Sequence, residues 1–183
     1  VWTYATDLAA GLRGRGVEVV LAVLGPAPAL DSEDRYSGDI RLIPAPLDWT
    51  AETPEAVLRA GDALAGLARQ ERVDILHLNS PALAAAGAFA GLPTVGVCHS
   101  DVATWWSAVK IGPLPPDLAW RAELTLQGYA ACDALLAPSR AFAEATAGAF
   151  GLARTPEVVW NGRAHLSRRE REGPAPKAWE GEG

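Results

Sequence analysis

The sequence has no methionine, only two cysteines and only two lysines among its 183 residues. Two cysteines are too few for a disulfide framework, which favours a reducing compartment, and we expect a cytoplasmic protein. No apolar run reaches the roughly 18 residues that cross a bilayer, and a peripheral membrane contact is not indicated. No secretory signal opens the chain. Because it begins with Val1, lacks methionine and starts inside a helical pattern, we expect a fragment of a longer protein.

The charge balance is acidic, with 16 basic residues against 22 acidic ones and a net charge of −6. A nucleic-acid partner requires a basic face, so this balance argues against one. Fourteen of the basic residues are arginines, which we attribute, with the abundant Ala and Gly, to a GC-rich coding bias. The hydrophobic content of 49% is typical of one globular domain.

Helical and apolar extended segments alternate along the chain. Apolar spacing predicts a first helix at the start of the chain, ended by Gly14 and Gly16. Thr53 and Pro54 give a second helix an N-cap and a proline at its first position, and it is expected to run to Arg72. Further helices are expected over 81–90, 117–131 and 140–149, and strands over 17–25, 39–46, 73–80, 93–99, 134–139 and 157–162.

This alternation is typical of a parallel sheet whose two faces are covered by helices. The sequence therefore predicts an α/β fold with a Rossmann-like doubly wound parallel sheet over residues 1–163. Residues 101–116 are rich in Trp and Pro and are expected to be irregular. Residues 164–183 lose apolar periodicity, and we interpret them as a linker or a disordered tail.

Small polar clusters follow four of the predicted strands. They are Asn79-Ser80, His99-Ser100-Asp101, Ser139-Arg140 and Asn161-Gly162. Open parallel sheets bind ligands beyond the carboxyl ends of their strands, so four clusters on one rim indicate a cleft. Two of the serines are also good N-caps for the helices that follow, which is the structural alternative at those positions.

His99 is the strongest candidate for a catalytic residue. A neutral imidazole at a strand end can exchange a proton near neutral pH or bond a ligand hydroxyl, and Asp101 could orient it or bind hydroxyls. The alternative is a histidine bonded to a neighbouring carbonyl. Cys98 should point to the opposite face of the strand, so a Cys–His nucleophilic pair is not expected. His77 is expected to be structural, and His165 lies in the predicted tail.

Trp105 and Trp106 admit two interpretations. An aromatic face packs well on the apolar C–H face of a sugar ring, or the two rings anchor a long loop on the domain. The glycines of 11–16 precede a strand instead of following one, so they are not a dinucleotide-binding loop. Neither a phosphate-binding loop nor a nucleophile elbow is present, and the His and Cys spacing gives no zinc site.

Taken in order, these segments resemble the N-terminal domain of GT-B glycosyltransferases, specifically retaining glycosyltransferase family 4. The quoted matches are VWTYATDLAAGLRGRGVEVVLAV, VDILHLNSPALAAAGAFAGLPTVGVCHSD, CDALLAPSRAFAEA and VVWNGR, which together cover about residues 1–163. In the family a first strand and a Gly-Gly turn precede the first helix. We therefore expect both to lie upstream of Val1.

The resemblance implies a two-domain enzyme whose N-terminal half holds the acceptor and whose C-terminal half binds a nucleotide-sugar donor. It implies transfer of a hexosyl group to a small molecule or glycan with retention, without a metal or other cofactor. His99 matches the family's cleft histidine, which contacts the transferred sugar. The expected substrate-binding residues are Ser100, Asp101, Trp105, Ser139, Arg140 and Asn161.

The donor half of the family is not represented in the chain. Glu172 and Glu180 have the spacing of the family's donor-site glutamates, but they lie in the Pro- and Gly-rich tail, and we interpret the match as chance. The fragment is therefore expected to be inactive alone. Two alternatives stay open, a sugar-nucleotide epimerase of GT-B fold and a non-catalytic Rossmann-like ligand-binding module.

Overall fold

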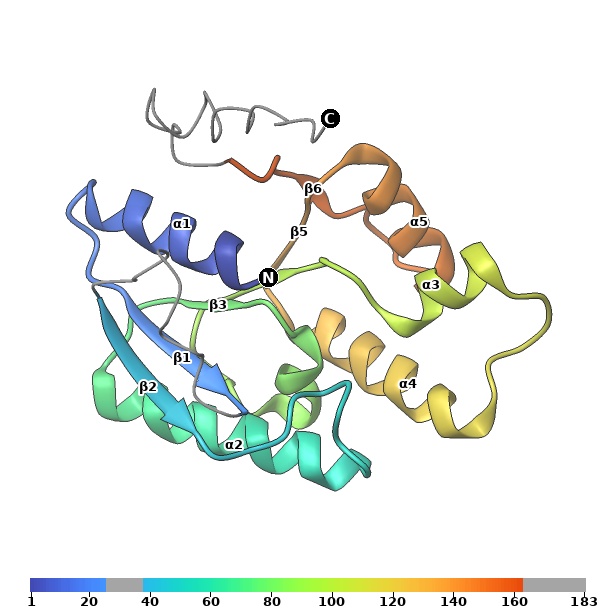
Figure 1. Ribbon diagram of the computed structural model, residues 1–183, viewed down its shortest axis with the longest axis horizontal. Helices are drawn as coiled ribbons and strands as arrows, with labels where there is room; N and C mark the ends of the chain where they lie inside the picture. Colours follow the sequence, from blue (N-terminus) through green and yellow to red (C-terminus); the bar gives the residue numbers. More distant parts are fainter. Residues whose placement is uncertain (26–37, 163–183) are drawn as a thin grey trace, which may run out of the picture.

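The computed structural model describes residues 1–25 and 38–162, in which helices and strands alternate (Figure 1). The elements are α1 (Trp2–Arg13), β1 (Val20–Leu24), β2 (Asp39–Ile43), α2 (Pro54–Glu71), β3 (Leu76–Leu78), the 3₁₀ helix η1 (Pro81–Gly87), β4 (Thr94–Val97), α3 (Val102–Val109), α4 (Pro116–Ala131), β5 (Ala134–Ala137), α5 (Arg140–Phe150) and β6 (Glu157–Val158). The predicted α/β class is confirmed. The predicted tail, residues 164–183, lies outside the described residues.

All strand pairs are parallel, but the described strands form two sheets instead of one. β1 pairs with β2, and β3, β4, β5 and β6 lie side by side in chain order. Within the described residues no ladder joins β1 to β3. Each of these two strands therefore has one edge whose backbone N–H and C=O groups have no ladder partner.

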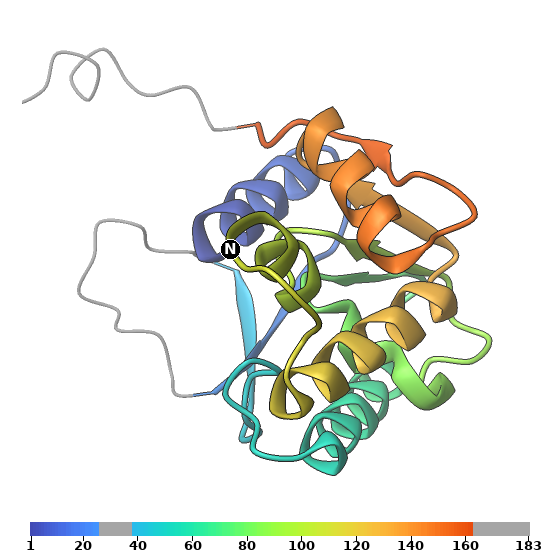
Figure 2. The ribbon, with the colours of Figure 1, turned by 90° about the vertical axis from the view of Figure 1, so that its right-hand side faces the viewer.

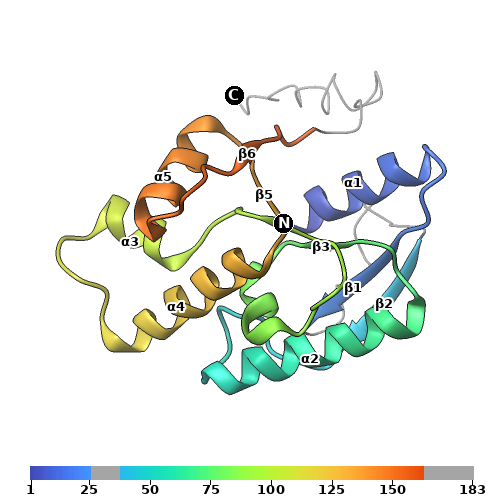
Figure 3. The same ribbon diagram turned by 180° about the vertical axis from the view of Figure 1, so that it is seen from behind.

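Helices lie on both faces of the strands. The larger core cluster joins Leu78 of β3 with α2, η1 and α4, and a smaller cluster joins Cys98 with Tyr129 of α4 and with α5. Figure 2 shows η1 beside α4 and α2. α1 lies on the other face, where Tyr4 contacts His77. Figures 1 and 3 show α1 above the strands and α2 below them. The doubly wound arrangement follows from this division.

The second helix forms as its cap residues predict. The Thr53 hydroxyl accepts a hydrogen bond from the Ala56 N–H at 3.3 Å, and Pro54 occupies the first turn, where no N–H donor is needed. The helix ends at Arg72, which adopts a left-handed conformation with φ of 53°. Both predicted ends of this helix are confirmed because both depend on local chemistry.

The helix predicted over 81–90 is wrong in kind. η1 is a 3₁₀ segment, and its regular geometry is interrupted at Ala86, where φ is +61°. α2 and α4 approach the backbone of η1 so closely that only glycines, Gly61 and Gly128, fit at the contacts. Tertiary packing therefore overrides the helix propensity of the Ala-rich sequence.

Residues 101–116 are not irregular throughout, as predicted, because α3 occupies half of the segment. Asp101 is the N-cap of α3, and its Oδ1 accepts a hydrogen bond from the Thr104 N–H at 2.7 Å. No proline occurs between Asp101 and Gly112. The helix therefore begins at a strong cap and meets no breaker before the turn that follows it.

All six predicted strands are shorter than expected, and two of them are reduced most. β3 covers only Leu76–Leu78 of the predicted 73–80, and β6 covers only Glu157–Val158 of the predicted 157–162. A strand exists only where a neighbour completes its ladder, and β4 and β5 offer partners over those residues alone.

Candidate functional site

The carboxyl ends of β3 and β4 bring Asn79 and His99 together. Leu78 lies opposite Gly96 in the parallel ladder, so both polar residues leave the sheet at the same edge. The His99 Nε2 atom is 2.9 Å from the Asn79 Oδ1 atom, and the two side chains are hydrogen-bonded. The direction of this hydrogen bond depends on which ring nitrogen of His99 carries the proton. The predicted rim therefore includes a direct contact between two of its four clusters.

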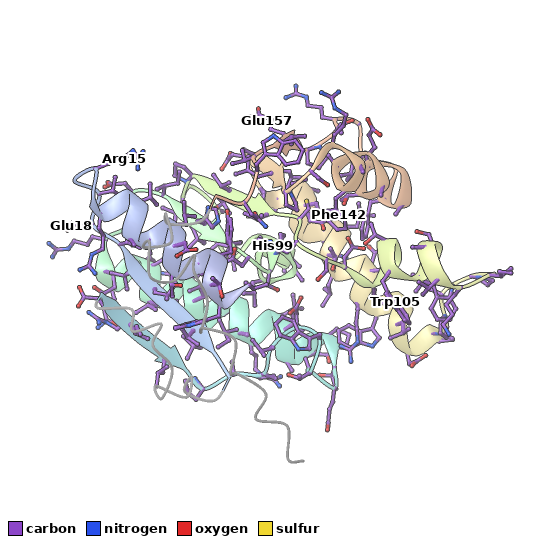
Figure 4. All side chains as sticks on the ribbon, turned by 45° about the horizontal axis from the view of Figure 1, so that its top comes forward. Arg15, Glu18, His99, Trp105, Phe142 and Glu157 are labelled. Atoms are coloured by element: carbon purple, nitrogen blue, oxygen red, sulfur yellow. The ribbon has the colours of Figure 1, made fainter. Side chains whose placement is uncertain are left out.

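α1 closes the other side of His99. The Tyr4 ring meets the imidazole edge to face, with a centroid distance of 4.5 Å and an interplanar angle of 75°. The Tyr4 hydroxyl is hydrogen-bonded to His77 Nε2 at 3.3 Å. His99, labelled in Figure 4, is thus held between an aromatic ring from the first helix and an amide from the adjacent strand.

The surroundings of His99 favour its neutral form. Burial lowers the pKa of His99, and the neighbouring His77 acts in the same direction. Burial also lowers the pKa of His77. At neutral pH the imidazole is therefore uncharged, and it acts as a hydrogen-bonding group with one donor and one acceptor nitrogen.

Cys98 lies on the opposite face, as the strand pleat predicts. It is 1% exposed and packs with Tyr129, Ala137 and Ala143. Burial raises the pKa of the Cys98 thiol to about 11, so the thiolate is not available near neutral pH. The prediction that Cys98 belongs to the core and does not pair with His99 is confirmed.

Asp101 and Ser139 both serve as helix caps. The Asp101 carboxylate caps α3 and makes no hydrogen bond to His99, whose partner is Asn79 instead. The Ser139 hydroxyl accepts from the Phe142 N–H at 3.2 Å and caps α5. Their predicted contacts with a substrate stay predictions, and the cap geometry occupies part of the hydrogen-bonding capacity of each side chain.

The other predicted binding residues are exposed at the same rim. Ser100 is exposed just before the N-cap of α3, Arg140 is exposed as the first residue of α5, and Asn161 is exposed after β6. Because β4, β5 and β6 are neighbours in the sheet, these residues lie along one edge in the order of their strands.

Trp105 and Trp106 have different roles although they are adjacent. The Trp106 Nε1–H donates to the Gly112 carbonyl at 2.9 Å and fastens the turn after α3, so the anchoring interpretation applies to this residue. Trp105 is 50% exposed, and its ring packs edge to face on Trp106. Figure 4 shows Trp105 apart from His99, out on α3.

Comparison with known protein families identifies the family of the chain. A family model described as Glycosyltransferase Family 4 matches residues 1–164. The chain belongs to glycosyltransferase family 4. No curated protein matches the chain. Family membership supports glycosyltransferase function in general for this domain.

Three side chains around His99 carry no functional prediction from the sequence. Tyr4 gave no signal, because a tyrosine at helical spacing is usually a packing residue. Asn79 was noted at the rim but not assigned a role, and His77 was expected to be purely structural. The alternating pattern of strand residues is the usable signal, since it places His77 and Asn79, two residues apart, on one face.

The described part of this glycosyltransferase domain offers no metal site. No group of three or more His, Cys, Asp or Glu side chains that could hold a metal ion occurs in residues 1–25 and 38–162. None of the helices in these residues combines the length and apolar character that crossing a bilayer requires.

Proposed function

We propose that the chain is the acceptor-side domain of a retaining hexosyltransferase. The full enzyme would transfer a hexosyl group from a nucleotide sugar to a small-molecule or glycan acceptor, without a metal. The observation that carries the proposal is the neutral imidazole of His99, held by Asn79 at the carboxyl ends of two parallel strands. Open α/β sheets bind their ligands at that edge.

His99 is the residue proposed to contact the transferred sugar. A neutral imidazole pairs well with an uncharged sugar hydroxyl, and a hydrogen bond that strengthens as charge develops stabilises the transition state. Trp105 has an exposed ring for the apolar face of an acceptor sugar. Ser100, Arg140 and Asn161 are exposed polar groups for its hydroxyls.

The donor half is proposed to lie in a second α/β domain after residue 163. Glu172 and Glu180, which have the spacing of the family's donor-site glutamates, fall outside the described residues. The domain alone is therefore proposed to be inactive. The absence of a ladder between β1 and β3 also supports the proposal that a further strand, from sequence before α1, completes the sheet.

The test uses the full-length protein with a panel of nucleotide sugars and sugar acceptors, with NMR to assign the anomeric configuration of the product. We expect transfer with retention, and about a 100-fold loss of turnover in His99→Ala. Glu144→Ala, an exposed position on α5, is the matched control and should keep full turnover.

The outcomes separate the alternatives. Unchanged turnover in His99→Ala removes His99 from the catalytic residues. Conversion of the nucleotide sugar to an isomer without an acceptor identifies an epimerase. Saturable binding of a sugar ligand with no turnover for any donor identifies a binding module.

A further inference from the structure

We infer that Asn79 is a positioning residue that holds His99 as the tautomer protonated on Nε2, leaving Nδ1 to accept a hydrogen bond from a substrate hydroxyl. The inference rests on the proposed function and adds the direction of one hydrogen bond. An unprotonated Nδ1 can only accept, so the substrate group beside His99 must be a hydroxyl that donates its proton, and not an oxygen that only accepts.

The geometry of the pair determines the tautomer. Asn79 Oδ1 faces His99 Nε2 at 2.9 Å, and an amide oxygen carries no proton, so Nε2 must supply it. A neutral imidazole has a single N–H. The other nitrogen, Nδ1, is then unprotonated, and no hydrogen bond to it is formed by the described residues.

Tyr4 restricts the ring from the opposite side. Its edge-to-face contact with the imidazole, at 4.5 Å between centroids, limits reorientation of His99. Tyr4 is itself hydrogen-bonded through its hydroxyl to His77. Three elements, α1, β3 and β4, therefore fix the plane of the ring before a substrate arrives, which lowers the entropy lost on binding.

The charged and titratable groups around His99 keep it neutral. His77 and Tyr4 face it from β3 and α1, and Asp101 is engaged in capping α3. A neutral ring makes the choice of tautomer chemically significant, because a protonated ring would present two donors whichever way Asn79 pointed.

The alternative is an Asn79 amide turned the other way. Asn79 Nδ2 would then donate to Nε2, Nδ1 would carry the proton, and His99 would offer a donor to the substrate. The two arrangements differ in a quantity that NMR measures directly.

The experiment measures the ring nitrogens of His99 by ¹⁵N-labelled NMR in the full-length protein at pH 7.5. We expect wild-type His99 to be protonated on Nε2. Asn79→Leu keeps the size but removes the acceptor, and should give a mixture of tautomers with roughly a 10-fold lower kcat. Asn79→Asp keeps an acceptor oxygen, and should restore the Nε2–H tautomer and most of the turnover lost in the leucine variant. Gln127→Leu removes an exposed amide on α4 and should change neither the tautomer of His99 nor the turnover.

Wild-type protonation on Nδ1, or an unchanged tautomer in Asn79→Leu, would overturn the inference. If the tautomer is unchanged while both Asn79 variants lose turnover, the role of Asn79 is structural only. A fixed Nε2–H tautomer in a protein that transfers no sugar contradicts the proposed function instead, because the tautomer is read without any substrate.

Discussion

Cys98 and His99 are neighbours in the chain, but their side chains lie on opposite faces of the strands in different surroundings. Cys98 is enclosed by α4 and α5, whereas His99 contacts Tyr4 of α1 and is hydrogen-bonded to Asn79. Burial moves the pKa of the thiol up and that of the imidazole down, in each case because it disfavours the charged form. Reactivity at residue scale is therefore decided by the face that each residue occupies.

The thiols provide a test at this scale. Burial raises the pKa of Cys98 to about 11 and that of Cys132 to about 12, from an ordinary value of 9.0. The folded protein thus holds its thiol protons to higher pH than the unfolded chain does. Stability linked to these groups is complete below pH 9 and is lost as the pH rises through 11.

We expect neither thiol of the native protein to react with a disulfide reagent at pH 8, and both to react after denaturation. Absorbance of the released thiolate measures the number of reacted groups. The denatured sample is the internal control for reagent and protein concentration. Rapid reaction of Cys98 in the native state would contradict its placement in the core.

At the scale of elements, two helices use glycine to approach η1. A Cβ atom on Gly61 of α2 would collide with the Leu83 carbonyl oxygen, and one on Gly128 of α4 would collide with that of Pro81. Glycine is otherwise unfavourable inside a helix, by about 0.5–1 kcal/mol relative to alanine. Close packing against η1 is what offsets this cost at both positions.

Gly66 lies in α2, as Gly61 does, and gives the matched comparison, because nothing lies within 4 Å of the position a Cβ atom would take there. We expect Gly61→Ala to lower the free energy of unfolding by about 1–3 kcal/mol through overpacking. Gly66→Ala should raise it by about 0.5–1 kcal/mol. Urea unfolding followed by circular dichroism measures both. Equal effects of the two substitutions would show that η1 does not pack against α2 as described.

At the scale of the whole molecule, the break between the two sheets is the main feature. α1, which lies beside this break, is loosely packed. Ala9 is its one buried residue, and no residue of α1 belongs to either core cluster. β1 has intermediate burial at all five positions. A parallel strand between β1 and β3 would pair with the backbone groups at both strand edges, and it would bury more of the apolar side chains of α1.

Hydrogen exchange tests this arrangement. The protein produced with the residues encoded before Val1 should show slower amide exchange in β1 and β3 and a higher unfolding midpoint, because a new strand would pair with both edges. β5, which already has neighbours on both sides, is the internal control and should change only as far as global stability does. Identical exchange in β1 and β3 with and without those residues would contradict the proposed strand.

The sequence by itself determined what depends on near neighbours. Thr53, Pro54 and Arg72 set the ends of α2 through local capping, and strand pleating placed Cys98 and His99 on opposite faces. Continuous apolar runs were sufficient for the α/β class, because burial on both faces of a parallel sheet leaves that pattern.

Only the tertiary structure decided what depends on distant partners. Asn79 reaches His99 across 20 residues of sequence, and Tyr4 reaches it from another helix. The lowered pKa of His99, the interruption of η1 and the break between β1 and β3 likewise arise from groups brought together by folding. Desolvation, close backbone contact and ladder pairing are properties of the space around a residue, and the order of residues along the chain does not contain them.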